Sequence, residues 1–228
     1  ANIQAAQDKT AVTSAESNFT YRKDSGKAII TGYTGTDSTV VIPSSIDGFE
    51  VTEIAGGAFR SSTMESVTFP DTLTWIGDSA FAKCDSLTEV RLPATDKFKH
   101  MGTYAFENCA NLKKIWVPED FKPSYMVAPF YQCAQLKEVE FEEGITEIPS
   151  SLMKSCPGIE SIVIPDTVTT IGSEAFSNCE NLKSVTLPSN LTEIRYEAFK
   201  KCTSLQKVEF PEGLKTIGTS AFSSCKTL

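Results

Sequence analysis

Seven cysteines are the residues of this chain whose type and spacing could do chemistry. The last four lie 23 residues apart, and thiolates bind metal ions, carry redox chemistry and form disulfides. A zinc centre needs clustered ligands such as C-x-x-C with a second pair nearby, and this spacing offers none. The sequence therefore predicts no metal and no cofactor. The cysteines are Cys84, Cys109, Cys133, Cys156, Cys179, Cys202 and Cys225.

The same spacing argues against a disulfide framework. If the copies stack as coils, equivalent side chains lie about 4.8 Å apart, slightly beyond the usual Cβ separation of a disulfide, and their parallel directions give poor torsions. The number of cysteines is also odd. Since free cysteine is among the most buried residue types, we expect a buried column of small apolar thiols.

Histidine-based catalysis would have to use His100, the only histidine of the chain. No nucleophile-elbow sequence accompanies it, and it aligns with Trp75 and Thr170 at the variable position before the repeat isoleucine. Carboxylate pairs such as Glu142 and Glu143 also fall at variable, solvated positions of the repeat. The sequence therefore predicts no catalytic residues and no enzyme.

These residues are positioned by a repeated unit that reads L-x-x-V-x-L-P-x-x-L-T-x-I-G-x-x-A-F-x-x-C. In the copy that spans 182–202, apolar residues flank polar ones and the segment ends at Pro188, a pattern that predicts a short strand. The inward spacing of Ala198, Phe199 and Cys202 predicts one helical or 3₁₀ turn.

A single copy cannot fold alone. Burial of roughly six large apolar groups stabilises one copy by about 2 kcal/mol per group. Ordering the backbone of its 23 residues costs about 1 kcal/mol or more per residue, which exceeds that gain. Stacked coils bury both faces and pair strand to strand. We expect an α/β, β-rich, right-handed solenoid: a curved parallel sheet with short helical or 3₁₀ turns, in about eight repeats of 23 residues.

The A-F-x-x-C, L-P and V-T-x-I-G elements together resemble the BspA-type leucine-rich repeats, found mainly on bacterial cell surfaces. The copy from Ile164 to Cys179 follows that pattern at nearly every position, and the resemblance extends from about Tyr33 onward. It implies a leucine-rich-repeat solenoid on a bacterial cell surface or secreted, with a role in adhesion to host proteins, epithelial cells or other bacteria.

The middle of the array departs from the pattern. Copies three and four are longer and carry Met101 and Tyr125 where isoleucine is usual, while copy five has Leu152-Met153 for Ala-Phe and Pro149 for glycine. The solenoid should be irregular there. Because proline fixes φ near −65°, the repeat glycine is expected to serve tight packing and not positive φ.

Three segments are expected along the chain. Residues 1–18 are polar and alanine-rich, which predicts a flexible N-terminal segment. Residues 19–39 hold two strand candidates around a turn and predict a capping hairpin. Residues 40–228 form the solenoid, which we expect to continue past Leu228 in the natural protein, since an uncapped end exposes a strand edge.

Charge and hydropathy restrict the partners. The formal net charge is −8, with cations scattered among the copies, which argues against a nucleic-acid surface or an anionic membrane surface. No apolar run approaches the ~18 residues that span a bilayer. The prediction is a monomer that neither binds nucleic acid nor inserts into a membrane.

The candidate recognition residues lie in copies three and four. Trp116 is expected in an exposed ladder position, where tryptophan is a favoured binding anchor. Aromatic and cationic residues near it in the array predict a partner-binding patch; the alternative is that the aromatics pack over the extra residues of the longer coils. The predicted residues are Trp116, Arg91, Lys114, His100, Tyr125 and Tyr131.

Three functions are compatible with this sequence. The leading one is a non-enzymatic surface module that recognises proteins or glycans on host or neighbouring cells, because a solenoid offers a long preformed face. The second is a stalk or spacer that displays another domain. The third is an accessory part of a carbohydrate-active protein, and the sequence shows no catalytic constellation that would support it.

Overall fold

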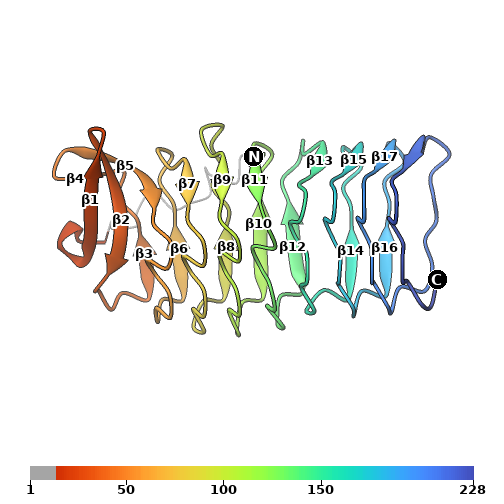
Figure 1. The fold of residues 1–228 in the computed structure, drawn as a ribbon, viewed down its shortest axis with the longest axis horizontal. Coiled ribbons are helices and arrows are strands. Elements are labelled where there is room, and N and C mark those ends of the chain that lie inside the picture. Colours follow the sequence, from red (N-terminus) through yellow and green to blue (C-terminus); the bar gives the residue numbers. More distant parts are fainter. Residues whose placement is uncertain (1–13) are drawn as a thin grey trace.

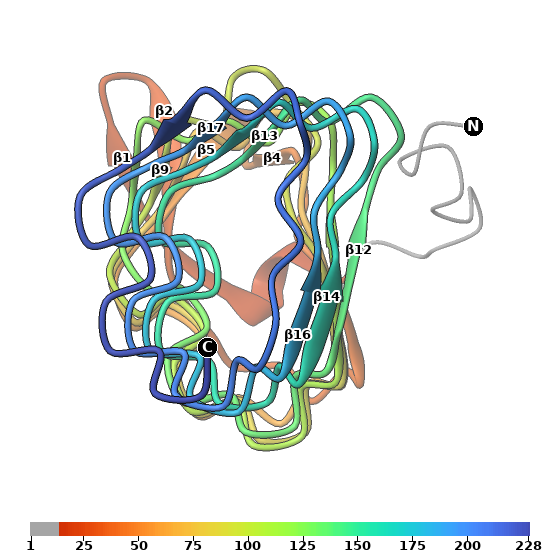
Figure 2. The ribbon, with the colours of Figure 1, turned by 90° about the vertical axis from the view of Figure 1, so that its right-hand side faces the viewer.

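The computed structural model describes residues 14–228, which wind into a β-solenoid of about eight turns. Successive coils stack along one axis, with the N-terminal hairpin and the last coil at opposite ends of the stack (Figure 1). Seen along that axis, the coils follow one another around a shared interior (Figure 2). The predicted solenoid architecture is confirmed.

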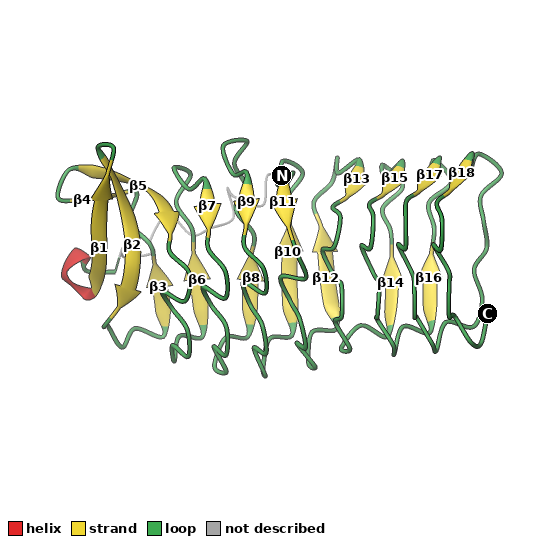
Figure 3. Cartoon of the chain, in the orientation of Figure 1, coloured by secondary structure: helices red, strands yellow, loops and turns green. Residues whose placement is uncertain are grey.

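Each coil contributes short strands to two rows, named here after their inward residues (Figure 3). The valine row carries inward Val or Ile, and the isoleucine row carries inward Ile or Met. The valine row consists of β3 (Thr39–Val41), β6 (Ser66–Thr68), β8 (Glu89–Arg91), β10 (Lys114–Val117), β12 (Glu138–Phe141), β14 (Ser161–Val163) and β16 (Ser184–Thr186). The isoleucine row consists of β5 (Phe49–Ile54), β7 (Trp75–Ile76), β9 (His100–Met101), β11 (Tyr125–Met126), β13 (Glu147–Ile148), β15 (Thr170–Ile171), β17 (Glu193–Ile194) and β18 (Thr216–Ile217).

An antiparallel hairpin of β1 (Phe19–Asp24) and β2 (Lys27–Tyr33) stands at the N-terminal end. Strand β2 pairs in parallel with β5, and the short β4 (Ser45–Ile46) pairs antiparallel with β5. The hairpin therefore continues the isoleucine row beyond the first coil, where it covers a strand edge that would otherwise be unpaired.

The predicted flexible segment 1–18 lies mostly outside the described residues. From Ser14 onward the chain is attached to the solenoid: the Ser14 backbone N–H donates to the Val41 carbonyl (3.3 Å), and the Val41 N–H donates to Ser14 Oγ (3.1 Å). A 3₁₀ turn, η2 (Glu16–Asn18), leads into β1. Residues 14–18 therefore contact the first coil and the hairpin, and the flexibility of segment 1–18 stays a prediction.

The A-F-x-x-C segments are turns rather than helices, which corrects the expected helical or 3₁₀ turns and the α/β class. In the second copy Ser79 (φ 51°) and Lys83 (φ 58°) adopt the left-handed conformation, which a right-handed helix cannot contain. Alternate N–H groups donate to the next coil: Ser79 to Thr103 (3.0 Å), Phe81 to Ala105 (2.7 Å) and Lys83 to Glu107 (2.8 Å). This turn side is thus a third hydrogen-bonded ladder between coils.

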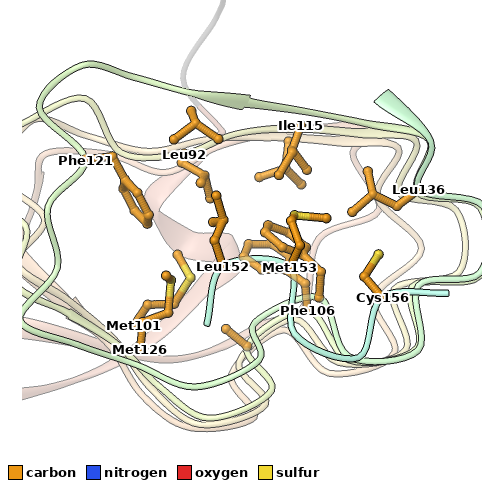
Figure 4. Packing of buried hydrophobic residues seen from close by; sticks show 14 of the residues in the cluster. Leu92, Met101, Phe106, Ile115, Phe121, Met126, Leu136, Leu152, Met153 and Cys156 are labelled. Atoms are coloured by element: carbon orange, nitrogen blue, oxygen red, sulfur yellow. The ribbon is translucent and has the colours of Figure 1, made fainter. Parts of the chain in front are cut away.

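One hydrophobic cluster fills the interior from Phe19 to Ala221. The repeat phenylalanines stack in it, with ring centroids 4.9 Å apart for Phe81 and Phe106 and 5.2 Å apart for Phe176 and Phe199. Between these two runs the fifth coil places Met153 at the phenylalanine position, next to Leu152 (Figure 4). The core is continuous, whereas the aromatic stack within it is interrupted.

The repeat glycine occupies a close approach between coils. A Cβ added to Gly102 would lie 2.4 Å from the Asp78 nitrogen, and one added to Gly172 would lie 2.6 Å from the Ile148 carbonyl oxygen. The N–H of Gly172 donates to that same carbonyl (2.9 Å). Close packing therefore explains these glycines, as the sequence predicts, and neither has a positive φ.

Both strand rows are interrupted between β12 and β13, and the turn side changes register there; the valine row has a further gap between β6 and β8. Strands β11 and β13 belong to different sheets, as do β12 and β14. Pro149 stands at the glycine position, and its nitrogen has no proton to donate to Met126. On the turn side the Gln132 N–H donates to the Ser155 carbonyl (3.0 Å). In the regular coils, as for Lys83 and Glu107, the accepting carbonyl lies one residue earlier in the copy. We call this interruption the ladder break; it separates an N-terminal stack ending at β12 from a C-terminal stack beginning at β13.

Candidate recognition surface

The cysteines form a column of thiols directed into the backbone of preceding coils. Cys202 Sγ donates to the Phe176 carbonyl (3.2 Å) and Cys179 Sγ to the Met153 carbonyl (3.0 Å). All seven cysteines are free; six are buried and Cys225 in the last coil is half-buried. Burial raises the pKa of Cys156 to about 12. The predicted column of buried thiols is therefore present, and its sulfurs satisfy backbone carbonyls.

Across residues 14–228, no group of three or more His, Cys, Asp or Glu side chains is arranged to hold a metal ion. His100 and the cysteines lie on different sides of the coil.

Trp116 is buried, with 8% of its surface exposed, so the expectation of an exposed tryptophan is wrong. The Arg91 guanidinium lies 3.8 Å from the indole centroid and the Lys114 ammonium 4.5 Å from it. Long cationic side chains cover aromatic faces with their stems and gain cation–π attraction. Trp116 therefore acts as a packing platform for two cations.

The cations over Trp116 are themselves paired. Lys114 Nζ lies 2.6 Å from a Glu140 carboxylate oxygen and 3.7 Å from one of Glu138. This bond to Glu140 raises the pKa of Lys114, and Lys114 lowers the pKa of the Glu140 carboxyl. The parallel register of Arg91, Trp116 and Glu140 across β8, β10 and β12 places these charges side by side on the valine row.

The isoleucine row carries a different aromatic feature, which we call the aromatic row: Trp75, His100 and Tyr125. The Trp75 and His100 ring centroids lie 3.4 Å apart and those of His100 and Tyr125 4.6 Å apart, with planes within 8°. Trp75 is 42% exposed and Tyr125 45% exposed. Burial between its neighbours lowers the pKa of His100. The parallel register of β7, β9 and β11 produces this stack.

The six predicted residues therefore lie on three sides of the coil. Arg91, Lys114 and Trp116 gather on the valine row, and His100 and Tyr125 on the isoleucine row. Tyr131 stacks on Tyr104, with centroids 4.8 Å apart, on the turn side. The structure does not bring the six into one patch.

Sequence reasoning missed Trp75 as a surface residue, although the signal was present. Trp75 aligns with His100 in the repeat. The expectation that Tyr125 takes the isoleucine position is wrong, since Met126 pairs with Met101 and Tyr125 lies in register with His100. Equivalent positions of parallel coils lie next to each other, so three aromatic residues in that column indicate a stack.

A cavity of about 380 Å³ opens at the ladder break, beside the end of the aromatic row. A smaller hollow of about 290 Å³ lies at the same break on the valine row, where it is lined by Lys114, Glu138 and the exposed Val163. The residues of the larger cavity used below are Lys122, Ser124, Tyr125, Glu147, Pro149 and Ser150.

The fold and this surface define a leucine-rich-repeat solenoid without a catalytic constellation among the described residues. The pattern described as "BspA type Leucine rich repeat region (6 copies)" matches residues 38–125 and 124–228. The chain therefore belongs to the BspA-type leucine-rich-repeat family. Proteins built from such repeats are interaction or structural modules, and are generally not enzymes.

Solved structures of similar proteins agree with this assignment. A leucine-rich repeat protein of T. pallidum is 28% identical, with a TM-score of 0.67, over 86% of this chain and 92% of that one. A leucine-rich repeat protein of Eubacterium ventriosum is 22% identical, with a TM-score of 0.52; the match covers 92% of this chain but 51% of that one. No functionally curated protein matches the chain.

Within residues 14–228, none of the helical segments has the length and apolar character of a membrane span.

Proposed function

We propose that this chain is a non-enzymatic recognition module that binds proteins or glycans on host or neighbouring cells, in the manner of an adhesin. The observation that carries the proposal is the aromatic row. Trp75 and Tyr125 expose over two fifths of their surface in a fixed stack, and exposed aromatic residues are favoured anchors of binding surfaces.

The aromatic row has the rigidity that tight recognition requires. Each of its rings stands on a strand that pairs with at least one neighbouring coil, and Tyr125 Oη lies 3.2 Å from Thr103 Oγ1. Side chains that are already ordered lose little rotamer entropy on binding. Of the predicted site residues, we assign His100 and Tyr125 to this surface and add Trp75.

The remaining predicted residues form neighbouring surfaces. Arg91 and Lys114 over Trp116 offer positive charge on the valine row, and Tyr131 with Tyr104 offers aromatic edges on the turn side. Ligands that wrap more than one side of the solenoid would reach them. We place the protein on a bacterial cell surface or in the secreted fraction, as the resemblance to BspA-type repeats implies, and expect it to act as a monomer.

A stalk or spacer is the second candidate, and the hydrogen-bonded ladders favour it. The isoleucine row pairs continuously from β1 to β11 and from β13 to β18, and such ladders resist extension along the axis. An accessory role in a carbohydrate-active protein is the third.

The test is binding of the purified chain, at physiological salt, to immobilised extracellular-matrix proteins, mucins and glycans. Trp75→Ala and Trp116→Ala are matched variants, since both remove one indole, from an exposed and a buried site respectively. We expect Trp75→Ala to weaken binding while Trp116→Ala chiefly lowers stability.

Other outcomes would decide between the alternatives. Binding lost only in a folded Trp116→Ala protein would move the recognition surface to the valine row. Absence of binding to every probe would refute the recognition role and favour the spacer. Enzymatic activity on a panel of polysaccharides would favour the carbohydrate-active context.

A further inference from the structure

The ladder break lacks one hydrogen bond that regular coils make. In neighbouring coils the residue at the glycine position donates its N–H to the preceding strand: Gly102 to Ile76 (2.7 Å), Gly172 to Ile148 (2.9 Å) and Arg195 to Ile171 (3.0 Å). Pro149 has no N–H to donate to Met126. Strands β11 and β13 do not pair, and a cavity of about 380 Å³ is lined by residues from both sides of the break.

The aromatic row ends at this cavity. One face of the Tyr125 ring lies against His100, with 8° between the planes. Tyr125 also lines the cavity and is 45% exposed, so its second face is available to a ligand. Across the break, Glu147 and Pro149 line the same cavity. A flat ring entering here would continue the stack of Trp75, His100 and Tyr125 by one member.

The polar groups around that face include both hydrogen-bond donors and acceptors. Ser124 Oγ donates to the Lys99 carbonyl (2.9 Å), so its lone pairs can accept, whereas Ser150 Oγ accepts the Ser173 N–H (3.1 Å), so its proton can donate. The Lys122 ammonium adds a charged donor at the cavity.

A carboxylate is held in place on the far side of the cavity. Glu147 Oε1 accepts from Arg195 Nη1 (2.6 Å), and Arg195 Nε reaches Glu193 (3.2 Å). This bridge fixes the Glu147 side chain, and a carboxylate keeps further acceptor sites beyond one such bond.

We propose that this cavity is a subsite for one pyranose ring of a glycan, with the apolar face of the sugar stacked on Tyr125 and its hydroxyl groups bonded to Glu147, Lys122 and the serine hydroxyls. The inference rests on the proposed recognition function and names its ligand class. A cavity of this size lies in the range of small-ligand sites.

A sugar ring fits this lining better than an aromatic side chain of a peptide. Both could stack on Tyr125, but an aromatic side chain would desolvate the Glu147 carboxylate and the Lys122 ammonium without giving them partners. Sugar hydroxyl groups donate and accept, and so match the mixed lining. The fixed Glu147 and the serine hydroxyls then orient the ring.

The experiment is a titration of the full chain with soluble cello-, chito-, malto- and galacto-oligosaccharides of four to six units, with binding measured by isothermal titration calorimetry. Tyr125→Ala removes the stacking face, Tyr125→Phe keeps it and Tyr196→Ala is a control that removes an exposed tyrosine outside the cavity. We expect Tyr125→Ala to weaken oligosaccharide binding about tenfold or more, with Tyr125→Phe and Tyr196→Ala close to the parent. Urea denaturation of each variant establishes that it is folded.

A second readout uses His100, the only histidine of the chain. Its ring lies 4.6 Å from that of Tyr125, so its imidazole proton signals should shift when a binding oligosaccharide saturates the site and should not shift in Tyr125→Ala.

The outcomes separate this inference from the proposed function. Oligosaccharide binding that all variants share equally would refute the subsite. Binding to matrix proteins without binding to any oligosaccharide would refute the pyranose assignment and leave the recognition role standing. Absence of binding to both kinds of probe would refute both.

Discussion

Replacing Phe199 by alanine tests how this solenoid is held together. Phe199 is fully buried, at 0% exposure, and its ring lies between Phe176 and Phe222, with centroids 5.2 Å from each and planes within 7°. The substitution therefore removes one ring from a stack that links three successive coils.

The expected loss follows from burial and packing. Burial of a phenylalanine side chain contributes about 2–3 kcal/mol, and the space left between two rigid neighbouring rings adds a cavity term, which brings the total to about 3–5 kcal/mol. Phe210→Ala is the matched control. Phe210 is 47% exposed and packs edge-on against Phe222, so the same change there should cost about 1 kcal/mol.

Equilibrium urea denaturation followed by far-UV circular dichroism measures both variants against the parent. Stability in stacked repeats is the sum of coil and interface contributions, and the loss at Phe199 affects interfaces on both sides. If Phe199→Ala and Phe210→Ala shifted the midpoint equally, the assignment of Phe199 to a tightly packed interior stack would be refuted.

Three further predictions follow from the ladder break, the thiols and the histidine. In Phe199→Ala, the fluorescence of Trp75 and Trp116, which both lie in the N-terminal stack, should report unfolding at higher urea than circular dichroism does; coincident transitions would show that the break does not divide cooperativity. Ellman's reagent at pH 8 should modify one thiol quickly, Cys225, and all seven only after denaturation; a fast reaction that persists in Cys225→Ser would contradict the burial of the others. Burial lowers the pKa of His100 from its usual 6.5, so just below pH 6.5 the folded state binds fewer protons than the unfolded state. The free energy of unfolding should therefore be highest above pH 6.5 and should fall as the pH drops through the folded pKa. Titration of the single imidazole by NMR gives the folded pKa, and His100→Gln should lack this part of the pH dependence; a folded pKa above 6.5 would reverse the sign.

Most of the fold can be predicted from the sequence because each stacked coil repeats the same inward positions. Val185, Ile194, Phe199 and Cys202 are buried or nearly so, as the recurrence of their types predicts. The same alignment places His100 beside Trp75. It is wrong for Tyr125, because the extra residue of the fourth copy leaves the alignment ambiguous there and Met126, not Tyr125, takes the isoleucine position.

The turn side shows where local spacing is ambiguous. Ala198, Phe199 and Cys202 have a spacing that fits a helical turn, but Glu197 (φ 53°) and Lys201 (φ 57°) are left-handed. Pairing with the next coil selects this conformation, because Phe199 N–H donates to the Ala221 carbonyl (2.7 Å). That partner lies outside the copy, so the spacing within one copy could not reveal it.

The sequence by itself determined the repeat, the inward residues, the buried thiols and the family. Only the tertiary structure decided which aromatic residues face solvent and where the ladders stop. Arg91 and Lys114 cover Trp116 from a neighbouring strand and from the same strand, whereas the outer face of Tyr125 stays open because strand β13 of the next coil does not pair with β11. Periodicity fixes which side of a coil a residue occupies. Its exposure depends on whether long side chains from adjacent coils cover it, and such coverage is set by contacts between residues far apart in the sequence.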